Sequence, residues 1–508
     1  MICDGKLISE IENKPFRFYL KKENNEMENL KTQLVVIAGG PSGMSAAVQA
    51  AMDGAEVIVI EKAAVTGGAA NMGMGPLGIG TKYQQEQMID VTVEKAFNMF
   101  MDYTHYNVDA RLVKRYFEQS AETIEWLEDM GVEFEGAFKY FPQSEATWHI
   151  VKTGNKIGPR AAGHMNKALL NKAQELGVKV MLETAGKKIL KDDEGKVCGV
   201  VAVNKDGEEF TIECQAAVIA TGGAGCNPEL IKEEIGVEYG KDVFNFAIPG
   251  LVGDGLKMAW EAGADHLPVR IESACDVGGG EEAGACVKNV LRQPNLLVNA
   301  FGKRVMNEEF MQNTTYLSNV ANHQKDKKLF SIVDSTIVKS YVKNGVDVTS
   351  LVTPDPDVSA FYEEMDEVIG KGSKNFFKAD TIEELAEMIG VDPEVLEETV
   401  DDYNDYCEGR DEEFFKNYRY LRKLKKGPFY CGTFHPGGYG TVGGIRINEN
   451  CEVCDKDFMP IPGLYAAGAD SCNIYDDSYM FLLPGNSMGY AVNTGRIAGM
   501  EAAEYIED

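Results

Sequence analysis

The fold is decided by residues 34–62, LVVIAGGPSGMSAAVQAAMDGAEVIVIEK. Residues 34–37 form an apolar, β-branched run of the kind that a buried parallel strand requires. A glycine turn at 38–43 follows, and an alanine-rich segment then predicts a helix to Asp53. A second apolar run from Glu56 to Ile60 leads to Glu61. The pattern predicts a βαβ unit.

Each part of this unit has a physical role in binding a dinucleotide. Glycines allow the backbone to approach a pyrophosphate, and the helix N-terminus offers unpaired N–H groups to it. Glu61 lies 21 residues after Gly40 and is placed to bind a ribose diol. Ala38 stands where the first glycine of the G-x-G-x-x-G fingerprint usually sits. The two strands, the helix and the carboxylate together still indicate a dinucleotide site rather than an unrelated tight turn.

Length and composition set limits on the kind of protein. A chain of 508 residues predicts two or three domains. The net charge of −30 argues against a nucleic acid or an anionic membrane as partner. No apolar run reaches the roughly 18 residues that a membrane span needs, and residues 1–31 are polar, without the apolar core of a signal peptide. We expect a cytoplasmic protein.

The eleven cysteines are scattered, which fits a reducing compartment. One close pair, Cys451 and Cys454, is compatible with a redox pair or half of a metal site. No second pair completes four ligands, and the run of cysteines that an iron–sulfur cluster needs is missing. We expect a turn between strands at this pair and no metal.

Further glycine-rich segments punctuate the chain. Residues 63–81 are dense in glycine, and residues 216–225 form another apolar strand that breaks into glycines, which indicates a second edge of the nucleotide site. Residues 84–131 show helical periodicity, and residues 197–212 predict a β-meander. Near the end of the chain, residues 482–499 predict a glycine turn that opens a helix. The dipole of that helix is suited to stabilise negative charge on an electron-rich ring.

Taken together, these segments resemble the flavoprotein family of fumarate reductase and succinate dehydrogenase, which also holds the 3-ketosteroid dehydrogenases. The matching motifs recur in family order from about residue 32 to the end. They are the 34–62 unit, Gly67-Gly68, Ala220-Thr221-Gly222-Gly223, Gly253-Asp254-Gly255, Gly302-Lys303-Arg304, Gly443-Gly444, residues 463–468 and Gly485-Asn486-Ser487.

The resemblance implies an α/β fold with a Rossmann-like FAD-binding domain that is split in sequence and carries an inserted α+β capping domain. We expect an N-terminal extension at 1–31, the two parts of the FAD-binding domain at 32–240 and 431–508, and the cap at 241–430. Family members that attach FAD covalently use a His just after the position of Gly68. Ala69 and Ala70 stand there in this chain, so we expect non-covalent FAD.

Carried over by motif, the expected FAD-binding residues come from all of these segments. They are Ala38, Gly40, Ser42, Gly43, Glu61, Lys62, Gly68, Ala69, Ala70, Asn71, Met74, Gly75, Ala185, Ala220, Thr221, Gly222, Asp254, Gly468, Asp470, Gly485, Asn486, Ser487 and Met488.

The catalytic pattern of the fumarate reductases is absent. Gln312 and Asn313 replace the family's Arg-Asp pair, Tyr439 replaces a substrate-binding His, and Leu482 replaces an Arg. The family's His-Pro-Thr signature does not occur in residues 267–280. A dianion needs such cations, because an ionised carboxylate in a dry site is costly without a charged partner. These replacements predict a pocket for a neutral, more apolar substrate.

Four residues are candidates for the chemistry. Tyr439 is the leading candidate donor or acid, because it takes the place of a histidine. The Gly485 N–H is a second donor, since ketosteroid dehydrogenases hold a ketone with this glycine turn. Tyr479 and Arg292 are weaker candidates; packed aromatic residues and a surface salt bridge are the alternatives. Ketosteroid dehydrogenases usually carry a Tyr near the position of Phe481.

The leading hypothesis is an FAD-dependent ene-reductase or dehydrogenase. It would move hydride between flavin N5 and the β carbon of a neutral or apolar α,β-unsaturated carbonyl compound, steroid-like or aryl. A dicarboxylate reductase with relocated cations and an electron-transfer subunit without catalysis are the alternatives. No second glycine fingerprint for a nicotinamide and no heme or cluster motif is found. The electron donor, NAD(P)H or a redox protein, stays open.

Overall fold

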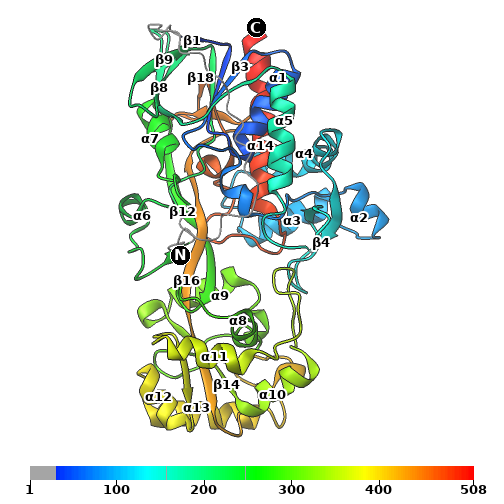
Figure 1. The fold of residues 1–508 in the computed structure, drawn as a ribbon, viewed down its shortest axis with the longest axis vertical. Coiled ribbons are helices and arrows are strands. Elements are labelled where there is room, and N and C mark those ends of the chain that lie inside the picture. Colours follow the sequence, from blue (N-terminus) through cyan, green and yellow to red (C-terminus); the bar gives the residue numbers. More distant parts are fainter. Residues whose placement is uncertain (1–29, 156, 246–247, 508) are drawn as a thin grey trace, which may run out of the picture.

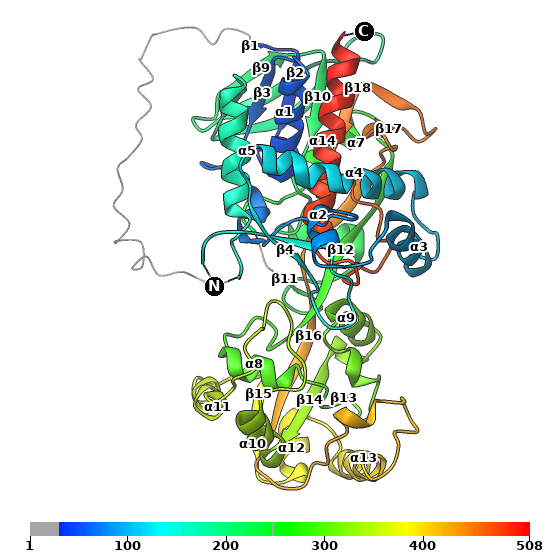
Figure 2. The same ribbon diagram turned by 90° about the vertical axis from the view of Figure 1, so that its right-hand side faces the viewer.

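The computed structural model describes residues 30–155, 157–245 and 248–507. Within them the chain forms two lobes stacked along the long axis of the molecule (Figures 1 and 2). The upper lobe holds both chain-terminal parts, including the long final helix α14 (Asn486–Glu507). The lower lobe is built from the middle of the chain. Within the described residues no helix combines the length and the apolar character that crossing a bilayer requires.

The upper lobe is organised around a six-stranded sheet in the order β17-β18-β10-β2-β3-β6, parallel except for β17. The predicted βαβ unit forms its centre, with helix α1 (Pro41–Met52) between β2 and β3. Buried, β-branched side chains fill the two strands, as a sheet covered on both faces requires. The strands are β2 (Leu34–Ile37), β3 (Val57–Ile60), β6 (Lys179–Met181), β10 (Ala216–Ile219), β17 (Glu452–Cys454) and β18 (Pro460–Ala466).

Helix α14 packs along α1 because glycines in α14 allow a close approach. A Cβ on Gly495 would lie 2.2 Å from the carbonyl oxygen of Ser42, and one on Gly499 would lie 2.4 Å from that of Ala46. The last helix of the chain therefore covers the first βαβ unit. Helix α5 (Gly163–Glu175) also packs on α1.

A second sheet in the order β1-β9-β8-β7 lies at the top of the same lobe. The predicted meander is confirmed as β8 (Val197–Asn204) and β9 (Glu209–Glu213), with β7 (Thr184–Lys191) as its partner. Strand β1 (Leu30–Lys31) pairs in parallel with β9. The rest of the expected N-terminal extension lies outside the described residues.

The helical pattern at 84–131 corresponds mainly to two amphipathic helices, α3 (Val93–Tyr103) and α4 (Ala110–Asp129), after the short α2 (Lys82–Glu86). Asp109 accepts hydrogen bonds from the backbone N–H groups of Arg111 and Leu112, which caps α4. The predicted apolar face of α4 is buried in the core of the upper lobe.

The lower lobe is the cap. Its sheet has the order β11-β16-β14-β13, and β12 and β15 also pair with β16. Helices surround this sheet, so the cap is α+β as expected. The strands are β11 (Phe244–Asn245), β12 (His266–Val277), β13 (Leu296–Asn299), β14 (Leu329–Asp334), β15 (Phe376–Ala379) and β16 (Phe429–Ile445); the helices are α8 (Ala285–Leu291), α9 (Thr314–Asn322), α10 (Ser335–Asn344), α11 (Phe361–Gly370), α12 (Ile382–Ile389) and α13 (Pro393–Tyr406).

The two lobes have separate apolar cores, and these cores locate the boundary between them. We expected boundaries at 240/241 and 430/431. The cores instead divide within β12, between Val269 and Cys275, and within β16, between Phe434 and Val442. Helix α7 (Asp254–Glu261) accordingly packs in the upper lobe. Strands β12 and β16 run through both lobes as a continuous antiparallel pair.

A buried ion network holds the cap together. The Arg304 guanidinium donates to the carboxylates of Glu308 and Asp411 at 2.8–3.0 Å, and these side chains are almost fully buried. Lys416 completes the network at 3.4 Å from Glu308. Arg304 therefore braces the cap.

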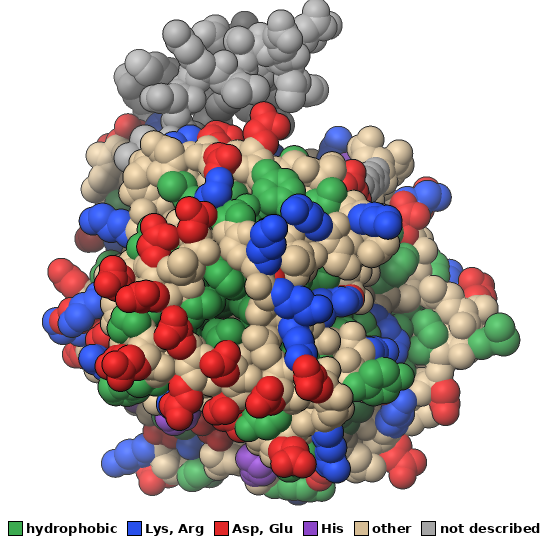
Figure 3. Space-filling model, turned by 90° about the horizontal axis from the view of Figure 1, so that it is seen from below, with side chains coloured by type: hydrophobic (Ala, Val, Ile, Leu, Met, Phe, Trp, Pro, Cys, Tyr) green, Lys and Arg blue, Asp and Glu red, His purple; other side chains and the backbone are tan. Residues whose placement is uncertain are grey.

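Seen from the cap end, acidic and basic side chains lie interspersed with exposed apolar ones (Figure 3).

Candidate active site

The turn between β2 and α1 forms the first part of a phosphate cradle. A Cβ on Gly43 would lie 1.9 Å from the carbonyl oxygen of Ala38, so only glycine fits there. Ala38 itself takes a φ of 89°, the left-handed conformation that the usual glycine adopts without strain. No side chain caps α1 at Gly40. The first-turn N–H groups, those of Ser42 and Gly43 among them, are thus left for an anion.

A second glycine turn packs directly against the first. The Gly67 N–H donates to the carbonyl oxygen of Gly39 at 2.8 Å, and a Cβ on Gly68 would lie 3.6 Å from Gly40 Cα. Asn71 fixes this turn: its Nδ2 donates to the carbonyl oxygen of Thr66, and its Oδ1 accepts from Asn166. Asn71 therefore holds the loop rather than reaching out of it. Ala69 and Ala70, in the same 3-10 turn, offer no nucleophile for a covalent bond to flavin.

Glu61, the carboxylate predicted to bind a ribose diol, lies at the end of β3. Glu61 is buried, and its two oxygens accept at 2.7 Å from the N–H groups of Gly39 and Ala63. These bonds orient the carboxylate beside the glycine turn. The next residue, Lys62, is 2.6 Å from Asp254 and joins the start of α7 to this edge of the sheet.

Asp470 closes the other side of the cradle. Its buried carboxylate accepts hydrogen bonds from the N–H groups of Thr221, Gly222 and Gly223 at 2.5–3.0 Å. Burial raises the pKa of Asp470, although the hydrogen bonds act in the opposite direction. The turn after Ala220 and the segment at 468–471 were each predicted to bind the cofactor, and the structure joins them directly.

The N-terminus of α14 faces the loop at 74–77. The Leu77 N–H donates to the carbonyl oxygen of Gly485 at 2.8 Å, and a Cβ on Gly485 would lie 2.7 Å from Trp148 Cδ1. Asn486 is fully buried and its Nδ2 has no hydrogen-bond partner within the described chain. A Cβ on Gly73 would lie 2.3 Å from the Met488 methyl group. The glycine cradle and this unsatisfied amide fit an extended dinucleotide.

Most of the other predicted cofactor residues surround the same space. Ala220 donates its N–H to the carbonyl oxygen of Ile37, which places the ends of β10 and β2 side by side. The Gly468 N–H donates to Thr494 Oγ1 at 3.0 Å. Met74 is buried, and the Gly75 carbonyl accepts from Trp148 Nε1. Ala185 lies on β7, paired with Val203, and is not shown to contact the cradle.

A β-bulge at the junction of the lobes displays the candidate catalytic side chains. Ile271 pairs with Thr441 and Ser273 with Gly438, so Glu272 on β12 lies opposite two residues of β16, Tyr439 and Gly440. A bulge of this kind interrupts the ladder and re-aims side chains beside active sites. Tyr439 is 40% exposed, in contrast to the fully buried strand around it.

The first group of polar side chains centres on Arg292, at the C-terminus of α8. Its guanidinium lies 3.7 Å from Asp276, and both Arg292 and the Tyr439 hydroxyl lie close enough to Tyr140 to act on the pKa of that tyrosine. Burial acts to lower the pKa of Arg292, but Asp276 and the tyrosines raise it overall. Gln312, at the family's arginine position, donates to the Arg292 carbonyl oxygen at 2.9 Å. Two predicted residues, Arg292 and Tyr439, are thus joined through Tyr140.

The second group surrounds the carboxyl of Glu272. Ser487 Oγ lies 3.4 Å from Glu272 Oε2, and the Tyr479 hydroxyl lies close enough to this carboxyl to act on its pKa. The Ser487 N–H donates to the Tyr479 oxygen at 3.0 Å. Burial raises the pKa of Glu272 to about 7 and raises those of Tyr479 and Tyr439 well above their usual range.

Aromatic rings connect the two groups. The Phe481 ring lies 5.3 Å from Tyr140, 6.2 Å from Tyr439 and 4.7 Å from Tyr479, centroid to centroid. Trp148 packs edge-on against Tyr140. Phe481 stands where the resemblance to ketosteroid dehydrogenases led us to expect a tyrosine, and three tyrosines pack around it.

Sequence reasoning missed Tyr140, Glu272 and Asp276. Tyr140 has no motif around it, and it reaches the site from a loop of the upper lobe. Glu272 carried no distinct signal, because charged and apolar residues alternate along β12, where Arg270 and Asp276 are also charged. The turn expected at Cys451 and Cys454 is instead largely strand: β17 (Glu452–Cys454) begins directly after Cys451 and ends at Cys454, and both cysteines are buried and free. Within the described residues no group of three His, Cys, Asp or Glu side chains could hold a metal.

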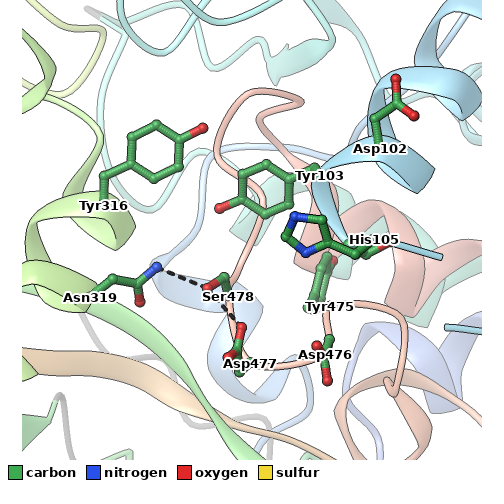
Figure 4. A pocket seen from close by; sticks show the side chains of 10 residues that line it. Asp102, Tyr103, His105, Tyr316, Asn319, Tyr475, Asp476, Asp477 and Ser478 are labelled. Atoms are coloured by element: carbon green, nitrogen blue, oxygen red, sulfur yellow. Dashed lines mark hydrogen bonds between the residues drawn. The ribbon is translucent and has the colours of Figure 1, made fainter. Parts of the chain in front are cut away.

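A cavity of about 350 Å³ lies between the two lobes, lined from the upper lobe by Tyr103, His105 and Asp477 and from the cap by Tyr316 and Asn319 (Figure 4). Tyr103 of α3 donates its hydroxyl to the Tyr479 carbonyl oxygen and stacks on Tyr316 of the cap. Asn319 of the cap donates to Ser478 Oγ at 2.9 Å. The segment that carries Tyr479 and Phe481 is therefore anchored to both lobes.

The split nucleotide-binding lobe, the inserted cap and the site between them define a flavin-dependent oxidoreductase. The model of the FAD binding domain family matches residues 33–488, and the chain belongs to this family. It binds FAD and acts on carbon–carbon bonds, as the enzymes of this group do. The suspected resemblance is thereby confirmed.

The similarity to individual relatives covers nearly the whole chain. A vinyl phenol reductase of Lactiplantibacillus plantarum is 32% identical over 487 residues, 93% of this chain and 96% of its own. A fumarate reductase (cytochrome) of Shewanella frigidimarina is 29% identical, over 93% of this chain and 77% of its own. Among solved structures, a 3-ketosteroid-Δ4-(5α)-dehydrogenase of Rhodococcus jostii matches with a TM-score of 0.74 at 24% identity, over 93% of this chain and 97% of its own. This last likeness confirms the predicted fold.

Proposed function

We propose that this enzyme is an FAD-dependent reductase of neutral, apolar compounds, in which a carbon–carbon double bond is conjugated with a carbonyl or an aryl group. The observation that carries the proposal is the composition of the site. Three tyrosines surround Phe481, and the cation among them, Arg292, already faces Asp276. A dicarboxylate would need cations free to pair with it. The chain instead has Gln312, Leu482 and Tyr439 at the family's cationic positions.

Bound FAD would exchange hydride at N5 with the β carbon of the substrate. The chain would bind and polarise the substrate. Tyr439 would donate its hydroxyl to the substrate oxygen, where negative charge develops, with Tyr140 and Arg292 strengthening this donor from behind. The Gly485 N–H at the start of α14 is the second donor. The rings of Phe481 and Trp148 would contact the apolar part of the substrate and exclude water.

The relatives support in part the proposal that the substrate is neutral. The vinyl phenol reductase is named for an aryl alkene that carries no carboxylate, and it matches this chain over almost its full length. The fumarate reductase of Shewanella is named for a dicarboxylate, and it keeps open the alternative that Arg292 binds a carboxylate here. A direct test of substrate charge decides between the two.

The electron donor of this reductase is proposed to be external, either NAD(P)H or a redox protein, because the chain carries one nucleotide fingerprint only. The ten cysteines in the described part of the chain are all unpaired as thiols. We therefore place the protein in the cytoplasm, where thiols stay reduced.

The test uses pairs of compounds that differ only in charge. The flavin of the purified holoenzyme is reduced anaerobically with dithionite, and its reoxidation is followed on adding methyl cinnamate, cinnamate, 4-vinylphenol, a 3-keto-4-ene steroid or fumarate. We expect reoxidation by one or more neutral compounds and at least about 10-fold slower reoxidation by cinnamate than by its methyl ester. If fumarate reoxidised the flavin at a rate comparable with that of the best neutral compound, the proposal would be overturned in favour of the dicarboxylate alternative.

A further inference from the structure

A partly buried carboxyl, that of Glu272, lies inside the site without a charged partner. Glu272 takes part in no ion pair within the described residues, whereas Asp276, four residues later on the same strand, faces Arg292. The bulge places Glu272 opposite Tyr439 and Gly440, where the cores of the two lobes meet. A carboxyl in such a place costs free energy as an anion, and the cost falls if it holds a proton.

The groups around Glu272 are all uncharged at neutral pH. Ser487 at the start of α14 donates a hydrogen bond to the carboxyl, and the Tyr479 hydroxyl faces the carboxyl from the loop before α14. Tyr439 on β16, together with Cys472 and Tyr475 from the segment after β18, faces it through space. Burial raises the pKa of the Glu272 carboxyl to about 7, so the carboxyl exchanges its proton in the physiological range.

We propose that Glu272 is the proton donor of the reduction, a role that rests on the proposed function above. Bound FAD would supply hydride to the β carbon of the substrate, and the Glu272 O–H bond would break as its proton forms the new C–H bond at the α carbon. The carboxylate that is left would accept hydrogen bonds from Ser487 Oγ and the Tyr479 hydroxyl. Solvent would then return the proton to Glu272, and the electron donor would supply the two electrons for the next turnover.

The other candidates suit a different task. Burial raises the pKa values of Tyr439 and Tyr479 well above neutral, so these hydroxyls polarise a substrate oxygen better than they surrender a proton. Arg292 is held as a cation by Asp276. Glu272 combines a place among the aromatic rings of the site with a proton that it can lose and regain. Each of the two polar groups thereby has one function, oxygen binding for Arg292-Tyr140-Tyr439 and proton delivery for Glu272.

The first measurement concerns protonation and needs no substrate. A carboxyl whose pKa is raised by folding stabilises the native state below its unfolded pKa of about 4.3, and this stability is lost as the pH rises through about 7. The side chain of Glu272→Gln cannot ionise. As the pH rises from about 4.3 to about 7, we therefore expect the thermal midpoint of the wild-type holoenzyme to fall relative to that of Glu272→Gln. The control is Glu398→Gln, an exposed change on the far side of the cap that leaves the wild-type profile intact. If the thermal midpoints of the wild type and Glu272→Gln changed with pH in the same way, the proposal would be overturned.

The second measurement concerns the reaction. With the neutral compound that reoxidises the wild type fastest, Glu272→Gln should reoxidise at least about 100-fold more slowly at unchanged FAD content. Glu272→Asp should recover part of the reoxidation rate that Glu272→Gln loses. In Glu272→Asp, as in the wild type, this rate should fall at alkaline pH. A wild-type rate in Glu272→Gln would overturn the role of Glu272. If no compound reoxidises even the wild-type flavin, the proposed function fails, while the thermal profiles still decide whether Glu272 carries the proton.

Discussion

The cofactor cradle and the substrate site are built by opposite means. The cradle is made of backbone: glycine turns at 39–43 and 67–68, and a third turn at 221–223 whose N–H groups are tied by Asp470. The proposed substrate site is made of side chains from separate segments of both lobes, including Tyr140, Glu272, Arg292, Tyr439 and Phe481. The cradle therefore tolerates little change in backbone shape. The substrate site can change its chemistry residue by residue while the fold stays the same.

The largest effect should come from breaking the cradle. In Gly43→Ala, the new Cβ would lie 1.9 Å from the Ala38 carbonyl oxygen, so the turn before α1 must move. We expect the purified variant to lack FAD, measured as flavin absorbance per mole of protein, and to lack all reductase activity. The matched control is Gly370→Ala in the cap helix α11, where a Cβ meets no atom within 4 Å. Full FAD content in Gly43→Ala would contradict the cradle described here.

A smaller but still large effect is expected at the carboxylate that ties the third turn. Asp470→Asn replaces one acceptor oxygen by a donor, so N–H groups of the 221–223 turn lose their partner inside the protein. We expect a loss of about 3 kcal/mol in the free energy of unfolding, because each unsatisfied buried group costs about 1–3 kcal/mol. Denaturant unfolding of the holoprotein measures it. A change below about 1 kcal/mol would mean that the turn does not depend on this carboxylate.

The substrate site should respond in rate and not in cofactor content. Tyr439→Phe removes the proposed donor to the substrate oxygen and keeps the ring that packs on Phe481. We expect reoxidation of the reduced flavin by a neutral substrate to slow about 100-fold, as for other lost transition-state donors, with FAD content unchanged. An unchanged rate would remove Tyr439 from the mechanism. Loss of FAD would show that the two regions are not independent.

The smallest effect is predicted for an ion pair at the edge of the cradle. Lys62 and Asp254 are each about one-third exposed, at 31% and 32% of their side chains, and solvent screens such pairs. Lys62→Met should lower the free energy of unfolding by less than about 1 kcal/mol and leave the FAD content near the wild-type value. A marked loss of FAD would instead assign Lys62 to cofactor binding, as the sequence predicted.

The fold was largely readable from the sequence because its signals are local. The strand, glycine turn, helix and carboxylate between Leu34 and Glu61 are contiguous, and the periodicity of α4 and the turn of the meander need no distant partner. The boundaries of the cap were not readable to the same degree. β12 and β16 continue through both lobes, so no break in composition marks the point where one core ends and the other begins.

By itself the sequence determined that the chain binds FAD, because glycine spacing and helix starts encode a backbone shape wherever they occur. It also named Arg292, Tyr439 and Tyr479 as candidates for the chemistry. The tertiary structure decided which side chains share the substrate site. A bulge of one residue sets Glu272 against Tyr439, and a loop brings Tyr140 between Tyr439 and Arg292. Such contacts depend on strand register and on the packing of segments far apart in the chain. A linear pattern does not encode either of these.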